Sequence, residues 1–300
     1  MAHSHSHAPA NYGRAFAVGA VLNLGFVIME AIFGLSSHSL ALLSDAGHNL
    51  GDVLGLLLAW GASYLSTRHP TERRTYGLRR SSILAALTNA IVLLVVTGGI
   101  GWEAIRRLSH SQPVASTTVM WVAAVGIAVN GITALMFVSG RKHDINLKGA
   151  FLHMASDAAV AFGVVLAGFA MRATGWFWLD PAISVLIGVV IMVGTWGLLR
   201  ESLNLALDAV PEGINPADVE AYLNRLPGVE AVHDLHIWGM STTEAALTVH
   251  LVTPDASIDD ALLSRINREL HDQFGIEHTT VQFEHGDISH PCGQAPAEVV

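Results

Sequence analysis

Six long apolar stretches fill the first two thirds of the chain and constrain its fold more than any other feature. They run over Ala15–Leu35, Leu40–Leu65, Ile83–Ile105, Thr117–Val138, Ala150–Met171 and Trp178–Leu199. Each reaches about the 20 residues that a helix needs to cross the hydrocarbon core of a bilayer, whereas buried soluble helices have shorter apolar runs. Only 14% of the 300 residues are charged, which is low for a soluble protein. The sequence therefore predicts a membrane domain of six α-helices.

The distribution of Lys and Arg predicts the orientation of these helices. One set of loops shares an excess of cations: Arg68, Arg73, Arg74, Arg79, Arg80, Arg141, Lys142, Lys148 and Arg200. The opposite side offers mainly Arg106, Arg107 and Arg172. Because cationic loops stay on the cytoplasmic side, we expect both termini in the cytoplasm. We expect an integral protein of the cell (inner) membrane.

The charge and cysteine content exclude several classes of protein. The formal net charge of -9 belongs largely to the stretch after Glu201, which argues against nucleic acid as a partner. Cys292 is the only cysteine, so an internal disulfide and a cysteine-rich zinc site are both excluded.

Two copies of the pattern His-x-x-x-Asp lie inside apolar stretches, at His48/Asp52 and His153/Asp157. Four residues make about one helical turn, so each pair projects from one helix face at one depth. A carboxylate inside a bilayer is costly and normally faces a cavity or a transport pathway. Two imidazoles and two carboxylates suit a tetrahedral divalent metal, above all Zn²⁺. A single pair would also fit a local contact that fixes a helix, but two copies favour a metal site.

The two pairs lie on the second and fifth stretches, which cross the membrane in opposite directions, as expected for an inverted repeat. Four further polar residues of the stretches are expected to join interhelical hydrogen bonds or a wet cavity rather than bind metal directly: Asn23, Glu30, Asn89 and Asn130. We expect Asp45 to have a helix-end or hydrogen-bonding role, and the alternative is an extra metal ligand. Asp180, before Pro181, is expected to begin the sixth helix.

Four motifs, in this order along the chain, carry a resemblance to a known family. They are LALLSDAGHNLGD (residues 40–52), RTYG (74–77), NLKGAFLHMASD (146–157) and VHDLHIW (232–238). With them the chain resembles the cation diffusion facilitators, in particular the zinc-exporting branch of bacterial zinc/cadmium/cobalt exporters and mammalian zinc transporters. The resemblance implies a six-helix membrane domain, a cytoplasmic α+β ferredoxin-like domain, a homodimer and proton-coupled metal export. It also carries the transport site onto His48, Asp52, His153 and Asp157, and His48 argues for zinc because manganese-selective members tend to have Asp there.

The residues after the sixth stretch predict a compact α/β module. We expect a helix over 216–226, strands over 229–239, 242–253 and 279–284, and an amphipathic helix over 258–274. The predicted domains are a His-containing cytoplasmic tail (1–13), the transport domain (14–208), a ferredoxin-like metal-sensing and dimerisation domain (209–290) and a C-terminal tail (291–300).

The resemblance also implies a regulatory metal site in this module. His233, His250 and Glu284 match its positions in relatives, with His236 and His285 as alternates. The competing interpretation is a set of surface histidines on a half-exposed sheet. The sequence does not decide whether two further sets of residues bind metal. The histidines of residues 1–7 either collect metal or have no role, and Cys292 either adds a thiolate or, as we expect, is a thiol without a role.

Arg80 and Asp208 match positions where relatives make a charge interlock. The alternative is that Arg80 extends to lipid headgroups and orients its helix.

Together these features predict a proton-coupled antiporter that exports Zn²⁺, with Cd²⁺ and Co²⁺ as further candidates. Its partners are a second copy of the chain, membrane lipid, metal ions and protons. Zn²⁺ is the transported substrate and a regulatory ligand, and no organic cofactor is expected. A passive metal channel is the first alternative. An intramembrane metalloenzyme is the second, but it needs an open metal position and a general base such as the Glu of His-Glu-x-x-His, a motif that the sequence lacks.

Overall fold

The computed structural model describes residues 13–66, 68–138, 145–254, 260–286 and 292–295. The histidines of residues 1–7 and the loop residue His143 lie outside these ranges. The chain divides into two compact units, one of residues 1–57 and 89–196 and the other of residues 58–88 and 197–300.

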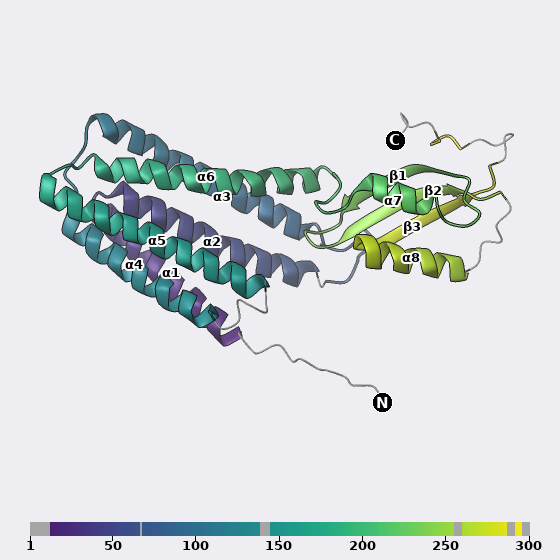
Figure 1. Ribbon diagram of the computed structural model, residues 1–300, viewed down its shortest axis with the longest axis horizontal. Helices are drawn as coiled ribbons and strands as arrows, with labels where there is room; N and C mark the ends of the chain where they lie inside the picture. Colours follow the sequence, from purple (N-terminus) through teal and green to yellow (C-terminus); the bar gives the residue numbers. More distant parts are fainter. Residues whose placement is uncertain (1–12, 67, 139–144, 255–259, 287–291, 296–300) are drawn as a thin grey trace. The chain divides into compact units, whose positions relative to one another are not determined.

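Six long helices follow the six apolar stretches (Figure 1). They are α1 (Gly13–Ser36), α2 (Leu40–Ser66), α3 (Ser81–Ser109), α4 (Ser116–Phe137), α5 (Ile145–Thr174) and α6 (Leu179–Ala206). Within the described residues, α3, most of α4 and α5, and α6 are long and apolar enough to cross a membrane, while Val21–Ser36 of α1 forms a shorter apolar helix. Large apolar side chains point outward from these helices; Trp121 and Val193, for example, are each 71% exposed. An apolar outer surface of this kind fits a bundle surrounded by lipid.

The first unit is packed through small residues and a shared apolar core. Buried side chains from all six helices meet there, among them Phe26, Leu42, Leu93, Val119, Val164 and Ile187. A Cβ added at Gly126 of α4 would lie 2.6 Å from the ring of Phe26, and one at Gly168 of α5 would lie 2.6 Å from Met120. Glycine at these contacts lets helices approach closely, as is common in membrane bundles. Figure 1 shows α4 and α5 side by side.

The start of α2 is held by a carboxylate from α6. Asp180 accepts hydrogen bonds from the Ser39 hydroxyl, from the Leu40 N–H at 2.7 Å and from the Ala41 N–H at 3.4 Å. These N–H groups have no partner within their own helix, so Asp180 acts as an N-cap supplied from another helix. Asp180 does lie in the first turn of α6, as the sequence predicts, but this second role fixes where α2 begins.

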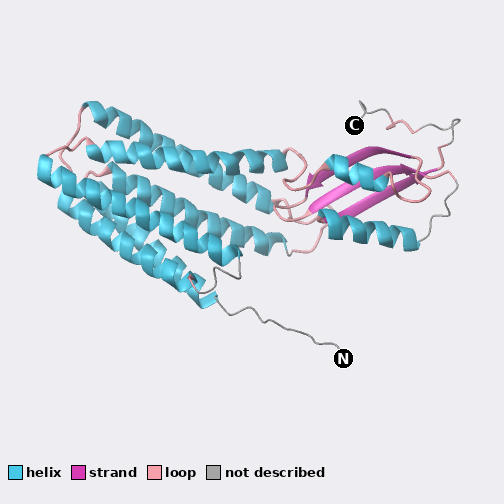
Figure 2. Ribbon diagram, viewed as in Figure 1, coloured by secondary structure: helices cyan, strands magenta, loops and turns pink. Residues whose placement is uncertain are grey.

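The second unit contains an α/β module, drawn with its three strands in Figure 2. It consists of α7 (Pro216–Leu223), β1 (Ala231–Gly239), β2 (Ala245–Val252), α8 (Asp260–Phe274) and β3 (Ile276–Glu284). The strand order is β1-β2-β3, with β1 antiparallel and β3 parallel to β2. The predicted elements are confirmed with shifts of a few residues at their ends. The side chain of Asn215 accepts from the Ala217 N–H at 3.1 Å and caps α7, and Gly275 (φ 68°) ends α8.

The two helices of the module cover one face of its sheet. Leu247, Val249 and Leu251 of β2 are fully buried in a core that also contains Leu223 of α7 and Ile266 of α8. Because side chains alternate along a strand, the residues between them in β2 point to the opposite face. His250 is one of these residues.

Candidate metal centres

The helices α2 and α5 bring together the four predicted transport ligands, which we call the helix cluster (His48, Asp52, His153 and Asp157). The Nε2 of His153 lies 3.1 Å from Asp52 and 3.6 Å from Asp157. The Nε2 of His48 lies 3.7 Å from each carboxylate. Each imidazole therefore contacts the aspartate of its own helix and that of the other helix.

The helix cluster has the dimensions of a metal site. Donor atoms of His48, His153 and Asp157 all lie within 4.8 Å of one another, while Asp52 contacts both imidazoles but stands outside this trio. The side chain of Asp157 is buried (4% exposed), whereas those of Asp52 and His153 are 34% and 40% exposed. An ion thus has access to the cluster on the side of Asp52 and His153.

A buried polar network lies beside the helix cluster. Glu30 of α1 is fully buried, accepts from the Asn49 amide at 3.4 Å and shares a hydrogen bond with Asp45. This confirms the hydrogen-bonding interpretation for Asp45 and Glu30. Asn23 donates to the sulfur of Met154 at 3.5 Å, linking α1 to α5.

Asn89 and Asn130 complete the set of polar residues in the apolar stretches. The Asn89 amide lies against Gly55, where an added Cβ would come within 2.9 Å of it. The buried amide of Asn130 makes no hydrogen bond to any residue that the structure describes, so of its two expected roles, an interhelical bond or a wet cavity, the first is not seen.

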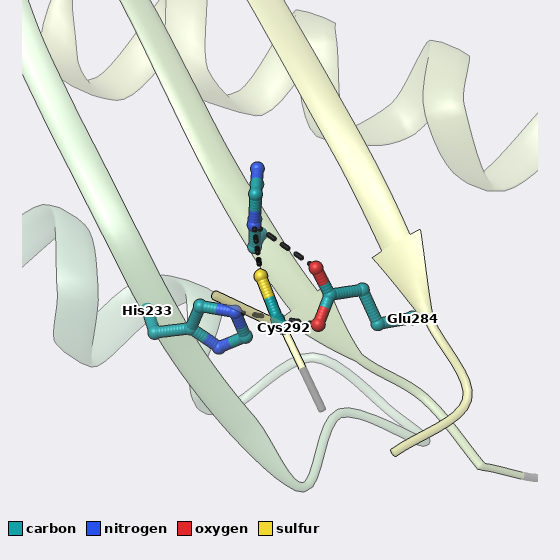
Figure 3. Close-up of side chains that lie close together, drawn as sticks. His233, Glu284 and Cys292 are labelled. Atoms are coloured by element: carbon teal, nitrogen blue, oxygen red, sulfur yellow. Dashed lines mark hydrogen bonds and ion pairs between the residues drawn. The ribbon is translucent and has the colours of Figure 1, made fainter. Parts of the chain in front are cut away.

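A second group, the sheet cluster, consists of one residue from each strand of the module (His233, His250 and Glu284) together with Cys292, which lies beyond β3. His233 of β1 and His250 of β2 are direct partners in the antiparallel register, and Glu284 ends β3. Glu284 lies 3.0 Å from His250 Nδ1 and 3.3 Å from His233 Nε2. Figure 3 shows His233, Glu284 and Cys292 converging on the face of the sheet opposite the helices.

The alternates from the sequence lie elsewhere. His236 contacts Asp234 at 2.8 Å, and His285 is exposed after β3; neither belongs to the four-residue group. Sequence reasoning missed Asp234 altogether, although the side chain is buried and its Oδ2 lies 3.5 Å from His250 Nε2. A register shift between His233 and His236 turns Asp234 towards this face.

Two family descriptions match the chain along most of its length. "Cation efflux transmembrane domain" matches residues 16–205, and "Cation efflux protein, cytoplasmic domain" matches residues 211–286. The chain belongs to the cation efflux family. This cation efflux protein is therefore an integral membrane transporter, not an enzyme, and its C-terminal α+β domain is cytoplasmic. The fold class predicted from the sequence is confirmed.

Three relatives span nearly the full length of this cation efflux protein. The cation efflux system protein CzcD of Alcaligenes sp. (strain CT14) is 40% identical over 98% of this chain and 92% of its own. The zinc transporter ZitB of Escherichia coli K12 is 36% identical over 97% and 94%, respectively. The cadmium, cobalt and zinc/H(+)-K(+) antiporter of Bacillus subtilis 168 is 33% identical over 93% and 91%.

One solved structure also resembles the chain. The metal-bound C-terminal domain of the CzcD transporter from Cupriavidus metallidurans is 40% identical, covers 24% of this chain and 99% of its own, and has a TM-score of 0.22.

Two residues of the sheet cluster in this cation efflux protein, Glu284 and Cys292, shift each other's pKa. Burial raises the pKa of Glu284, but hydrogen bonds from Cys292 and Gln282 and the two imidazoles outweigh it and lower the pKa overall. A backbone hydrogen bond from Gln294 lowers the pKa of the Cys292 thiol, but burial and the Glu284 carboxylate raise it overall. The opposite directions of the two shifts reflect the contact between this thiol and this carboxylate.

Charged contacts join the loop between α2 and α3 to the residues around the module, all within the second unit. Arg80 forms an ion pair with Asp208, the pair that the resemblance implied. Arg79 pairs with Glu244 at 2.6 Å, and the Ser82 hydroxyl accepts from the Thr242 N–H at 3.1 Å. The last two contacts were not predicted.

Proposed function

We propose that this cation efflux protein exports Zn²⁺ from the cytoplasm in exchange for protons, and that the helix cluster carries the ion. The crosswise contacts of 3.1–3.7 Å between two imidazoles and two carboxylates support this proposal. Side chains at these distances can bind one small cation together, or the protons that replace that cation.

Competition between metal and protons supplies the coupling. A divalent cation binds neutral imidazole and ionised carboxylate, so binding releases protons and protonation releases the ion. Imidazole suits this exchange because its reference pKa of about 6.5 lies in the physiological range. The site binds metal while it is open to the cytoplasm. It then opens to the other side of the membrane, so each transport cycle exchanges metal for protons.

The donor set favours zinc and admits related ions. Two nitrogen and two oxygen donors suit Zn²⁺, while affinity order alone does not exclude Co²⁺. The relatives named above include a zinc transporter and a cadmium, cobalt and zinc antiporter. Cd²⁺ and Co²⁺ are therefore secondary substrates in this proposal, and Cd²⁺ is the poorer fit because it is larger.

The cytoplasmic module senses metal in this proposal. His233, His250 and Glu284 form its regulatory site, and the module joins two copies of the chain into a homodimer. Residues 14–208 form the transport domain and residues 209–290 the sensing and dimerisation domain, in the cell (inner) membrane with both termini in the cytoplasm.

Zinc uptake into inverted membrane vesicles tests the transport mechanism. We expect uptake to rise several-fold with an imposed pH gradient, acidic inside, and to fall to background in Asp157→Ala although that variant still inserts and dimerises. Ser156→Ala, on the same helix but exposed, is the matched control and should transport normally. Uptake independent of the gradient would instead favour a passive channel, and near wild-type uptake by Asp157→Ala would contradict the role of the helix cluster.

A further inference from the structure

The only cysteine of the chain lies against the proposed regulatory site. The Sγ of Cys292 is 3.5 Å from His250 Nδ1, and the thiol also hydrogen-bonds to Glu284. The sequence places Cys292 beyond the last strand, where we expected a thiol without a role. In the fold it faces three other groups that bind metals.

The four donors of the sheet cluster are spaced for one cation. One donor atom from each residue lies within 4.8 Å of all the others. Zinc bonds of about 2.0–2.3 Å in a tetrahedron put neighbouring donors about 3.3–3.6 Å apart. Two of the observed distances lie within that range, 3.3 Å (His233 to Glu284) and 3.5 Å (His250 to Cys292), and the third, 3.0 Å (His250 to Glu284), is slightly shorter.

The hydrogen bonding of the cluster is incomplete. The Nε2 of His233 is buried and makes no hydrogen bond to any described residue, although it faces the Glu284 carboxylate at 3.3 Å. A buried polar atom without a partner is costly. A cation between this nitrogen and the carboxylate would satisfy both.

Asp234 lies between two histidines, with His236 at 2.8 Å and His250 at 3.5 Å. The Oδ2 of Asp234 lies 3.5 Å from the Nε2 of His250. This is the other ring nitrogen of His250 from the Nδ1 that contacts Cys292 and Glu284. The backbone of Asp234 adopts φ 51° at the register shift in β1, a conformation that non-glycine residues rarely adopt. A carboxylate that accepts a proton from one ring nitrogen leaves the other nitrogen free to bind a metal.

We propose that Cys292 completes His233, His250 and Glu284 as a closed four-donor site for Zn²⁺ or Cd²⁺, with Asp234 as the residue that positions His250. This inference rests on the regulatory site proposed above and adds a thiolate to it. Sulfur makes the site select zinc and cadmium over Mn²⁺ and Mg²⁺, which prefer oxygen. Four protein ligands leave no open position, as in structural rather than catalytic zinc sites.

Cobalt absorption of the full-length protein tests the role of the thiol. Because Cys292 is the only cysteine, a thiolate-to-cobalt charge-transfer band in the near ultraviolet reports this site alone. We expect the band when Co²⁺ is added to the wild type and to Asp157→Ala, whose transport site is disabled. Cys292→Ser should lose the band, and Cys292→His should lose it while retaining the bound ion.

Equilibrium dialysis separates the possible failures. Suppose that the wild type lacks the band but still binds an ion, and that His233→Ala loses this ion. That result would overturn the role of Cys292 but leave the site of His233, His250 and Glu284 supported. No such ion in the wild type would overturn the regulatory site itself. Either result leaves the zinc uptake test of the helix cluster unaffected.

The positioning role of Asp234 has its own measurement. Asp234→Asn should keep the charge-transfer band but weaken cobalt binding about 10–100-fold, the usual effect of removing a carboxylate behind a metal-binding histidine. Asp234→Glu should restore part of the affinity. Unchanged affinity in Asp234→Asn would show that Asp234 has only a local structural role.

Discussion

The crosswise contacts of the helix cluster make its four residues a single unit. Neither histidine depends on its own helix alone, since each also contacts the aspartate across the gap. A change at one position therefore alters the surroundings of all the others. We expect selectivity, as well as rate, to respond to substitutions here.

Replacing His48 by aspartate should broaden the range of transported metals. The change exchanges a borderline nitrogen donor for a hard oxygen donor, which favours Mn²⁺ relative to Zn²⁺. The carboxylate is also more flexible than the imidazole ring, so it can accommodate the larger Cd²⁺. Competition of each metal with zinc uptake in vesicles measures the effect, and we expect roughly a tenfold relative gain, equivalent to about 1.4 kcal/mol of differential binding. A profile still restricted to zinc would mean that selectivity resides in another residue.

The sequence located some site residues and not others for identifiable reasons. His48, Asp52, His153 and Asp157 follow from spacing, because a helix repeats regularly and a charge in an apolar stretch needs an explanation. Asp234 depends on an irregularity of β1 that no periodic pattern encodes. Cys292 lies eight residues beyond the end of β3, outside every predicted element, so no periodic pattern relates it to its partners.

At the scale of the elements, the capping of α2 by Asp180 controls where the helix that carries His48 and Asp52 begins. The Ser44 and Ser184 hydroxyls add a second contact between α2 and α6 at 2.5 Å. Together these bonds fix the ends of α2 and α6 to each other. The position of the helix cluster therefore depends on a residue that does not touch it.

We expect Asp180→Ala to fray the start of α2. Losing an N-cap costs about 1 kcal/mol, and hydrogen–deuterium exchange at Leu40 and Ala41 should accelerate roughly fivefold as a result. Asp180→Asn keeps one acceptor oxygen and should have a smaller effect. Unchanged exchange in the alanine variant would show that α2 does not need this cap.

A second link between elements joins α7 to α8 in the cytoplasmic module. The Tyr222 hydroxyl donates to Glu269 at 2.7 Å, and Arg265 lies 2.9 Å from the same carboxylate. These contacts lower the pKa of Glu269 below its usual value. A carboxyl whose pKa is lowered by folding stabilises the fold above its unfolded pKa of about 4.3 and loses that effect as the pH falls through its folded pKa.

Glu269→Gln should therefore loosen the module at pH 7 but not in acid. Hydrogen–deuterium exchange of α7 and α8 in the full-length protein measures this, with faster exchange than in the wild type at pH 7 and no difference once the carboxyl is protonated. Asp272→Asn, a change of an exposed carboxylate on α8 that contacts only His271 among described residues, is the matched control. A difference that persists in acid would assign the effect to packing rather than charge.

At the scale of the whole molecule, the apolar stretches and the strand pattern were sufficient to predict both domains. Hydropathy did not predict that α3 extends to Ser109 or that α5 begins at Ile145, because those turns are polar and continue the helix without an apolar signal. The contacts of Arg79 and Ser82 were also not predicted, since pairing between distant segments leaves no trace in a single sequence. Arg80 and Asp208 were found only through resemblance.

The Arg80–Asp208 ion pair should support transport rather than folding. Both side chains are about half exposed, so the pair contributes at most about 1 kcal/mol. We expect Asp208→Lys to reduce zinc uptake severalfold and the added change Arg80→Asp to restore part of it. Because Asp208 has φ 60°, where Asn is tolerated, Asp208→Asn separates the loss of charge from backbone strain. A double variant no better than the worse single variant would favour contact of Arg80 with lipid headgroups.

The crosswise pairing of the helix cluster has an electrical consequence. Its two aspartates are neutralised equally by one divalent cation between neutral imidazoles and by one proton on each imidazole. Exchange of one Zn²⁺ for two protons would therefore carry no net charge through the bilayer, and export would not respond to membrane voltage. Exchange for a single proton would move one charge per cycle, equivalent to about 2.3 kcal/mol per 100 mV. Zinc export measured at imposed voltages thus counts the protons that return through the site.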